Sequence, residues 1–180
     1  ISIGGLIGFN VGNIYNAYSN GNISVIGYVV GHIGGLIGTN AGSFYGKGVV
    51  NSFWDTETSR MAESAGGTPK TTAEMQNINT FLDAGWDVKA HHEDLNNGYP
   101  FLSWQLGNSP TWYIYSDFAA GTGSSENPYQ IANWHHLNNV RNYLDKYFIV
   151  VNNLDTTTEG YDEYASSTAN DGKGWEPIGT

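Results

Sequence analysis

The feature that most constrains this chain is a repeat near its start. Residues 3–10 (IGGLIGFN) recur as residues 33–40 (IGGLIGTN), so seven of eight positions match at an offset of 30. A second match, between residues 14–18 and 49–53, has an offset of 35, which places five extra residues near Ser43 to Lys47. A unit this short cannot bury its apolar side chains alone, so the copies are expected to pack on one another.

The pattern inside one copy indicates strands. Three apolar stretches, residues 3–7, 14–18 and 23–30, are separated by Asn- and Gly-rich corners. Three strands per 30 residues favour one turn of a parallel β-helix, and alternation along residues 14–18 puts Asn16 beneath Asn51 in an asparagine ladder. A hairpin sandwich stays open, because Asn-Gly is also a hairpin signal. The expected fold class is therefore mainly β: a parallel β-helix (β-solenoid) with short capping α-helices.

The residues that follow the repeat predict a helix. Thr71 and Glu74 have the spacing of a capping box, apolar residues follow at helical intervals over 75–82, and Gly85 suits a C-terminal stop. We expect a helix of about three turns that covers an end or side of the solenoid.

The second half has its own signals. Residues 107–110 (GNSP) read as a boundary, and residues 113–118 are strand-like. Asn133 is placed to cap a helix whose apolar face is formed by Trp134, Leu137, Val140 and Leu144. Residues 147–151 (YFIVV) predict a further strand.

Several sequence motifs of the chain together resemble those of a known family. The units IGGLIGxNxG, the tract SFWDTETS at residues 52–59 and the sequence YPFL at residues 99–102 are similar to GLUG repeats of large bacterial and archaeal surface proteins and adhesins. The resemblance covers residues 1–105, and residues 121–131 and 175–179 are similar to the opening of another such module. It implies three segments: 1–106, the last turns and cap of one solenoid; 107–117, a linker and strand; and 118–180, the cap and first turn of the next. The family has no catalytic motif to carry over.

Charge and composition limit the partners. The formal net charge is −10, which disfavours nucleic acid and anionic membranes as partners. The chain has no Cys, which excludes disulfides and Cys-ligated zinc and is compatible with an extracellular location. It also has no apolar run long enough to cross a bilayer, so we expect no membrane insertion.

Candidate sites for chemistry are weak in the sequence. Gly4-Gly5-x-x-Gly8 lacks the phosphate-loop spacing, and close strand packing is the better interpretation. His91-His92 and His135-His136 are adjacent pairs whose side chains point apart in regular structure, so neither pair is expected to share a metal ion. We predict no catalytic, cofactor-binding or metal-ligating residue.

Acidic and aromatic residues leave two alternatives open. The acidic segment with Asp155, Glu159, Asp162, Glu163 and Asp171 has the oxygen-rich character of Ca²⁺ loops without their spacing. Carboxylates suited to glycoside cleavage (Asp55, Glu57, Asp87) are scattered, and Trp112, Tyr113 and Tyr115 suit sugar stacking or a core equally.

The sequence therefore predicts a non-enzyme. We expect an extracellular structural or adhesive module of a surface protein, a segment of an S-layer, sheath, filament or adhesin. Its expected partners are further copies or neighbouring modules of the same protein, or a surface glycan. The alternative is a carbohydrate-binding or carbohydrate-active β-helix.

Overall fold

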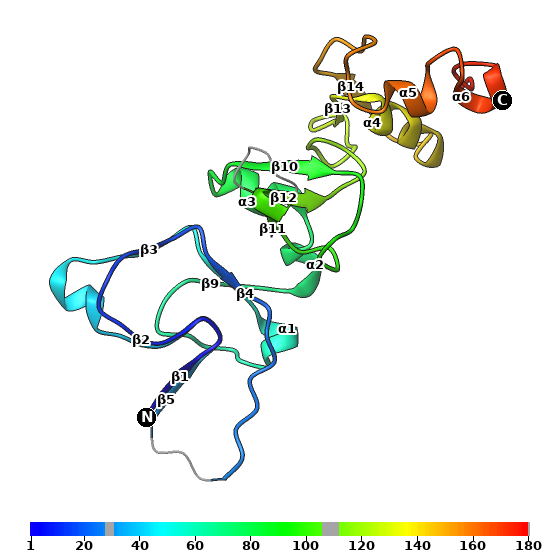
Figure 1. Ribbon diagram of the computed structural model, residues 1–180. Helices are drawn as coiled ribbons and strands as arrows, with labels where there is room; N and C mark the ends of the chain where they lie inside the picture. The colour runs from blue at the N-terminus through cyan, green and yellow to red at the C-terminus, as the bar shows by residue number, and fades with distance from the viewer. Residues whose placement is uncertain (28–30, 106–111, 180) are drawn as a thin grey trace. The chain divides into compact units, whose positions relative to one another are not determined.

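A computed structural model describes residues 1–27, 31–105 and 112–179. The chain divides into two compact units, Ile1–Trp86 and Asp87–Thr180 (Figure 1). The expected boundary at residues 107–110 lies outside the described residues, and the division into three expected segments stays a prediction.

The first unit consists of strands of two to four residues and three short α-helices. Its strands are β1 (Ser2–Gly4), β2 (Ile7–Asn10), β3 (Ile14–Tyr15), β4 (Tyr18–Ser19), β5 (His32–Gly34), β6 (Ile37–Asn40), β7 (Val49–Val50), β8 (Phe53–Asp55) and β9 (Thr68–Lys70). Its helices are α1 (Thr56–Ser59), α2 (Thr72–Met75) and α3 (Ile78–Asp83), with a 3-10 turn, η1, at Ala41–Tyr45.

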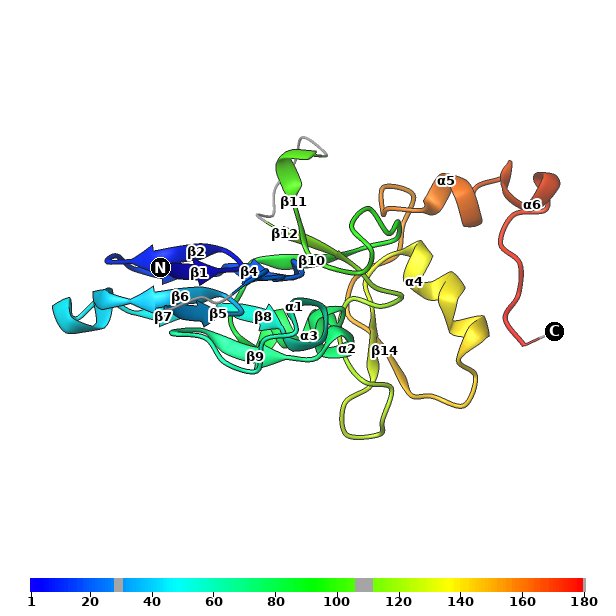
Figure 2. The same ribbon diagram turned by 90° about the horizontal axis from the view of Figure 1, so that it is seen from below.

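The two copies of the repeat pair side by side, in parallel and in register. Ile3 lies beside Ile33 and Ile7 beside Ile37, at the offset of 30 seen in the sequence. In Figure 2 the first copy forms one layer, the second copy forms the next, and β9 lies beyond it. The core between these layers is formed by Ile14, Leu36, Ile37 and Trp54.

The five extra residues are accommodated at one corner. They fall in η1 and the two residues after it, and η1 is followed by Gly46 in a left-handed conformation with φ of 67°. Pairing then resumes at the offset of 35, with Ile14 beside Val49. The insertion therefore changes the corner and leaves the register of the following strands intact.

An asparagine ladder does form, but at a different pair from the expected one. Asn10 Nδ2 donates to Asn40 Oδ1 over 2.8 Å. Asn16 and Asn51, expected in the ladder, both have positive φ, at 48° and 49°. They occupy equivalent turns, where the left-handed backbone interrupts the strand alternation on which that expectation depended.

Glycine in the repeat allows close packing, as the sequence indicated: a Cβ on Gly4 would lie 2.7 Å from the backbone nitrogen of Gly38 in the second copy. A Cβ on Gly35 would lie 2.0 Å from Cδ1 of Trp54, which has only 3% of its surface exposed. The space beside Gly35 is thus filled by an indole ring, and no side chain fits there.

Side-chain caps determine where the helices of this unit begin. The buried Asp55 accepts from the amides of Glu57 and Thr58 and so caps α1. Thr71 and Glu74 form the expected capping box at α2. Asn77 starts a second helix, α3, so the single helix of three turns is wrong, although Met75, Ile78 and Phe81 are buried as its pattern required.

The second unit combines two small sheets with short helices. Its strands are β10 (Val88–His91), β11 (Phe101–Leu102), β12 (Trp112–Tyr115), β13 (Tyr129–Ile131) and β14 (Phe148–Val150). Its helices are α4 (Trp134–Asn139), α5 (Tyr161–Tyr164) and α6 (Ala169–Gly172), with 3-10 turns η2 (Ser103–Gln105) and η3 (Val140–Asn142). β12 pairs with β10 in parallel and with β11 antiparallel, while β13 and β14 form a separate parallel pair.

Two elements of the second unit were predicted correctly from short sequence motifs. Asn133 caps α4 by accepting from the amide of His136 over 2.9 Å. The predicted strand at residues 147–151 is present as β14.

The predicted fold class is wrong. The described residues form six separate sheets of two or three strands, one of them mixed, together with short helices; the fold is a mixed α/β arrangement and not a mainly β solenoid. Two reasons are physical: the Asn- and Gly-rich corners leave strands of only two to four residues, and capping side chains start helices from Asp55 onward. The third strand expected in each copy is also absent from residues 23–27; residues 28–30 lie outside the described part.

Candidate functional site

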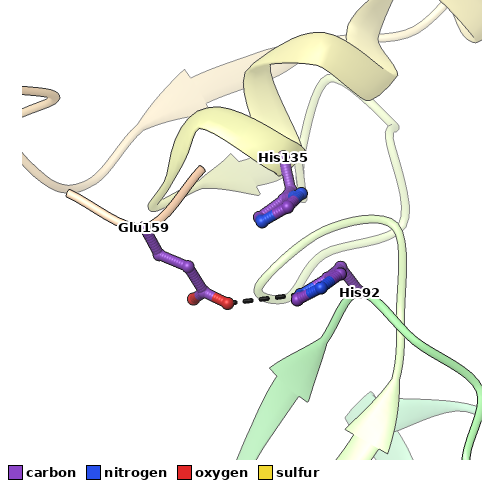
Figure 3. A group of neighbouring side chains, drawn as sticks. All are labelled: His92, His135 and Glu159. Atoms are coloured by element: carbon purple, nitrogen blue, oxygen red, sulfur yellow. Dashed lines mark ion pairs between the residues drawn. The ribbon is translucent and has the colours of Figure 1, made fainter. Parts of the chain in front are cut away.

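A cluster of two histidines and one glutamate lies in the second unit. His92, His135 and Glu159 come from three segments that are distant in sequence, and their nitrogen and oxygen atoms lie within 4.8 Å of one another. Figure 3 shows the two imidazole rings side by side and the carboxylate directed at His92. This is the one group of three such side chains in the part of the chain that the structure describes.

The geometry of the cluster is tight. His92 Nδ1 is 3.3 Å from Glu159 Oε1. The rings of His92 and His135 stack with centroids 3.9 Å apart and planes 4° from parallel. The His135 side chain is 8% exposed, whereas those of His92 and Glu159 are 36% and 53% exposed, so the cluster is buried on one side and open on the other.

A strand and a helix determine the positions of the two histidines. His92 follows the last residue of β10, which is held in its sheet by four paired positions with β12. His135 lies in the first turn of α4, whose start is fixed by the Asn133 cap.

The loop that carries Glu159 is tied to the same helix end. Asn133 Nδ2 donates to Glu159 Oε2 over 3.2 Å, and the backbone amide of Trp134 donates to the Glu159 carbonyl over 3.0 Å. Trp134 Nε1 also donates to the carbonyl of Asp155 over 3.0 Å. Three hydrogen bonds therefore position the glutamate beside the histidines.

In each His-His pair, one histidine accepts a backbone hydrogen bond and the other faces the cluster. His91 Nδ1 accepts from the backbone amide of Glu93 over 3.1 Å, and His136 Nδ1 accepts from that of Ala132 over 3.2 Å. Their neighbours His92 and His135 face the cluster. The rings of His91 and His92 stack with centroids 4.7 Å apart, so these two adjacent side chains do not point apart as the sequence argument assumed. That argument also did not foresee that one member of each pair would meet in the cluster.

Burial favours the neutral form of the helix histidines. Burial lowers the pKa of His135; the nearby His92 lowers this pKa further, while Glu159 and Glu163 act in the opposite direction. Burial also lowers the pKa of His136 to about 4. Both rings are therefore neutral at neutral pH and keep a lone pair available.

A pocket opens beside the cluster. It is lined by His92, His135, Glu163 and residues 156–162. A second cavity of the same unit is also lined by Glu159, together with Lys89, Tyr113, His136 and Asn153. The cluster is thus accessible to a small ligand or ion.

The acidic candidates for Ca²⁺ do not gather around one point. The Asp155 carboxylate accepts from the amide and hydroxyl of Thr157, over 2.9 and 2.7 Å, and so forms a local turn. Glu159 is directed to His92 instead, and Glu163 lies 3.9 Å from His135 Nδ1. The Ca²⁺ hypothesis stays a prediction.

The carboxylates considered for sugar chemistry have structural partners. Besides its capping bonds, Asp55 accepts from the hydroxyl of Thr72 over 2.7 Å, and Glu57 accepts from the amide of Thr72 over 2.8 Å. Asp87 lies in the other unit and uses its carbonyl to accept from the amide of Trp112. Tyr113 packs on Phe101 and His91.

Comparisons with known proteins show similarity over part of the chain. The chain is similar to a protein of Evansella cellulosilytica named "Putative Gly-rich membrane protein", with 45% identity over 86 residues. That stretch is 47% of this chain and 10% of the relative, so the chain spans about a tenth of the relative's length. No family model and no solved structure matches the chain. The resemblance to GLUG repeats therefore stays a prediction.

Membrane-spanning helices are not found in the described residues. Every helix there is too short or too polar to cross a bilayer.

Proposed function

We propose that the chain is a non-catalytic structural or adhesive module of a bacterial or archaeal surface protein, and that it associates through the outer edge of its first repeat copy. The observation that carries the proposal is the unequal cover of two equivalent leucines. Leu36 is fully buried, whereas Leu6, at the same position of the first copy, is 46% exposed.

The second copy is covered by a later segment of the chain. Ser64 accepts from the amides of Leu36 and Ile37 over 3.2 and 2.8 Å, and the carbonyl of Glu63 accepts from the amide of Gly35. In the first copy, β1, β2 and β3 each pair with one strand only, and in each case that strand belongs to the second copy. Their outer edges are therefore open to an added strand.

Apolar side chains accompany these open edges. Phe9 is 58% exposed and Tyr15 is 62% exposed, in β2 and β3, with Leu6 and Val11 nearby in sequence. Rows of exposed apolar groups beside open strand edges are typical of association surfaces.

A second copy of this same edge is the partner that the charges favour. Residues 1–54 contain no Asp or Glu and only one Lys, Lys47, although the chain as a whole carries a net charge of −10. Two such edges can approach without the repulsion that the acidic remainder would cause. Apolar contact and strand pairing would then hold them together.

The extracellular location belongs to the proposal. It draws on the resemblance of the repeats to GLUG surface proteins, on the lack of Cys, and on the name of the matched relative, which refers to a membrane. Glycan binding is the competing hypothesis.

Sedimentation velocity over a range of chain concentrations tests the proposal. We expect reversible association of the wild type, weakened at least about tenfold by Phe9→Lys because a charge would be buried at the edge. Phe44→Lys is the matched control, since Phe44 is 87% exposed and lies in η1 at the corner of the second copy. A wild type that stays monomeric up to about 1 mM while binding a glycan array would overturn the proposal in favour of the sugar-binding alternative.

A further inference from the structure

We propose that His92, His135 and Glu159 form a binding site for a divalent transition-metal ion of the Zn²⁺ class. The proposal stands on the convergence of two imidazoles and one carboxylate from three segments, with all donor atoms within 4.8 Å. It is independent of the association edge, because all three residues belong to the second unit.

The donor set matches this class of ion. Imidazole nitrogens and carboxylate oxygens bind Zn²⁺ at about 2.0–2.2 Å, which places neighbouring ligand atoms of a tetrahedral site about 3.3 Å apart. His92 Nδ1 and Glu159 Oε1 are already 3.3 Å apart. The rings of His92 and His135 are stacked 3.9 Å apart, and because the lone pair of an imidazole nitrogen lies in the ring plane, the His135 ring would have to turn out of this stack to bind the same ion.

The surroundings of the ligands resemble the outer shell of a metal site. Glu159 Oε2 accepts from Asn133 Nδ2 over 3.2 Å, which leaves Oε1 for the ion. The Glu163 carboxylate lies 3.9 Å from His135 Nδ1. Carboxylates and amides placed behind ligands in this way orient them and increase metal affinity.

An ion bound here would link three segments of the second unit. Three protein ligands leave a fourth position, which opens to the pocket lined by Gly160 and Glu163 and can be filled by water. The ion would tie the end of β10 to the start of α4 and to the loop of Glu159. Binding energy that requires this folded arrangement adds to the stability of the unit.

Titration of the metal-free chain with ZnCl₂, followed by isothermal calorimetry, tests the site, with CoCl₂ absorption as a readout of coordination geometry. We expect one ion per chain, and affinities about 10- to 100-fold weaker in His92→Gln and Glu159→Gln. His32→Gln is the control, because His32 is an exposed histidine of the other unit and should leave the affinity unchanged.

A second measurement separates loss of a ligand from loss of folding. Circular dichroism of the metal-free variants should match the wild type, and ZnCl₂ should raise the thermal midpoint of the wild type but not of His92→Gln. The proposal is overturned if the wild type does not bind Zn²⁺ at micromolar concentration, if His92→Gln binds it as tightly as the wild type, or if CaCl₂ binds in its place.

Discussion

Asn10 of the first repeat copy donates a hydrogen bond from its side-chain nitrogen to the side-chain oxygen of Asn40, the equivalent residue of the second copy, over 2.8 Å. Asn10 also donates to the carbonyl of Gly12 and accepts from its amide. This side chain therefore joins the two layers and closes the corner that follows β2.

Removal of this side chain should destabilise the first unit. Asn10 is only 7% exposed, so Asn10→Ala leaves its part-buried partners Asn40 and Gly12 without a hydrogen bond and should cost about 1–3 kcal/mol. Denaturant unfolding followed by tryptophan fluorescence measures the loss. Asn22→Ala, at an exposed position, is the control; equal midpoints for the two variants would contradict the role of the ladder.

The two equivalent leucines should respond differently to the same substitution. Leu36→Ala opens a cavity in the core with Ile14, Ile37 and Trp54 and should cost about 2–5 kcal/mol. Leu6→Ala, at a half-exposed position, should cost less than about 1 kcal/mol in dilute solution. Similar losses for both variants would show that the first copy is covered in solution.

The hydroxyl of Tyr143 should make the second unit sensitive to alkaline pH. It donates to the Asp117 carboxylate, and this bond, with burial next, raises the pKa of Tyr143 to about 12 from 10.0. Because the folded pKa is raised, the stabilisation is complete below pH 10 and is lost as the pH rises through about 12.

Tyr143→Phe measures that effect. The variant should lose about 1–2 kcal/mol at neutral pH, and its difference from the wild type should shrink between pH 10 and 12. Tyr147→Phe, at an exposed position, should show no such trend. A difference for Tyr143→Phe that is independent of pH would contradict the assigned cause.

The stabilisation by the capping box at α2 should be lost at acidic pH. The backbone hydrogen bond from Thr71 is the largest cause that lowers the pKa of Glu74 from 4.5, and Lys70 contributes next. Because the folded pKa is lowered, the stabilisation is present above pH 4.5 and is lost as the pH falls through the folded value.

Glu74→Gln is the test of the capping box. The stability difference between this variant and the wild type should be present at pH 7 and vanish at low pH, where Glu74 is protonated. Glu93→Gln, at an exposed position, serves as the control and should show no comparable trend. The expected difference is small because the Glu74 side chain is 47% exposed.

Local and repeated features of the fold could be predicted from the sequence. The offsets of 30 and 35 correspond to the observed register of paired strands, because equivalent side chains pack in equivalent positions. Capping residues such as Thr71 and Asn133 act on the backbone within three residues, so their effect depends little on distant contacts.

Features set by backbone angles and distant contacts could not be predicted. The ladder at Asn10 rather than Asn16 depends on the left-handed backbone of Asn16, which Asn adopts far less often than the strand conformation. The β-helix expectation failed because pattern alone did not show that the strands would be so short and would form separate sheets of two or three strands.

The histidine–glutamate cluster could not be predicted from the spacing of residues in the sequence. Its three members lie in no motif, and the stacking of His92 on His135 requires the whole second unit to fold. The two His-His dipeptides were the signal that the sequence offered, and the argument considered each pair only by itself and predicted no metal site.

The corner at Ala41–Tyr45 offers a practical consequence for engineering. Since Ile14 still pairs with Val49 after five extra residues there, the corner is a site that tolerates insertions. Epitopes, fluorophore tags or affinity handles grafted between Ser43 and Gly46 should be displayed from the scaffold without disturbing its neighbouring strands.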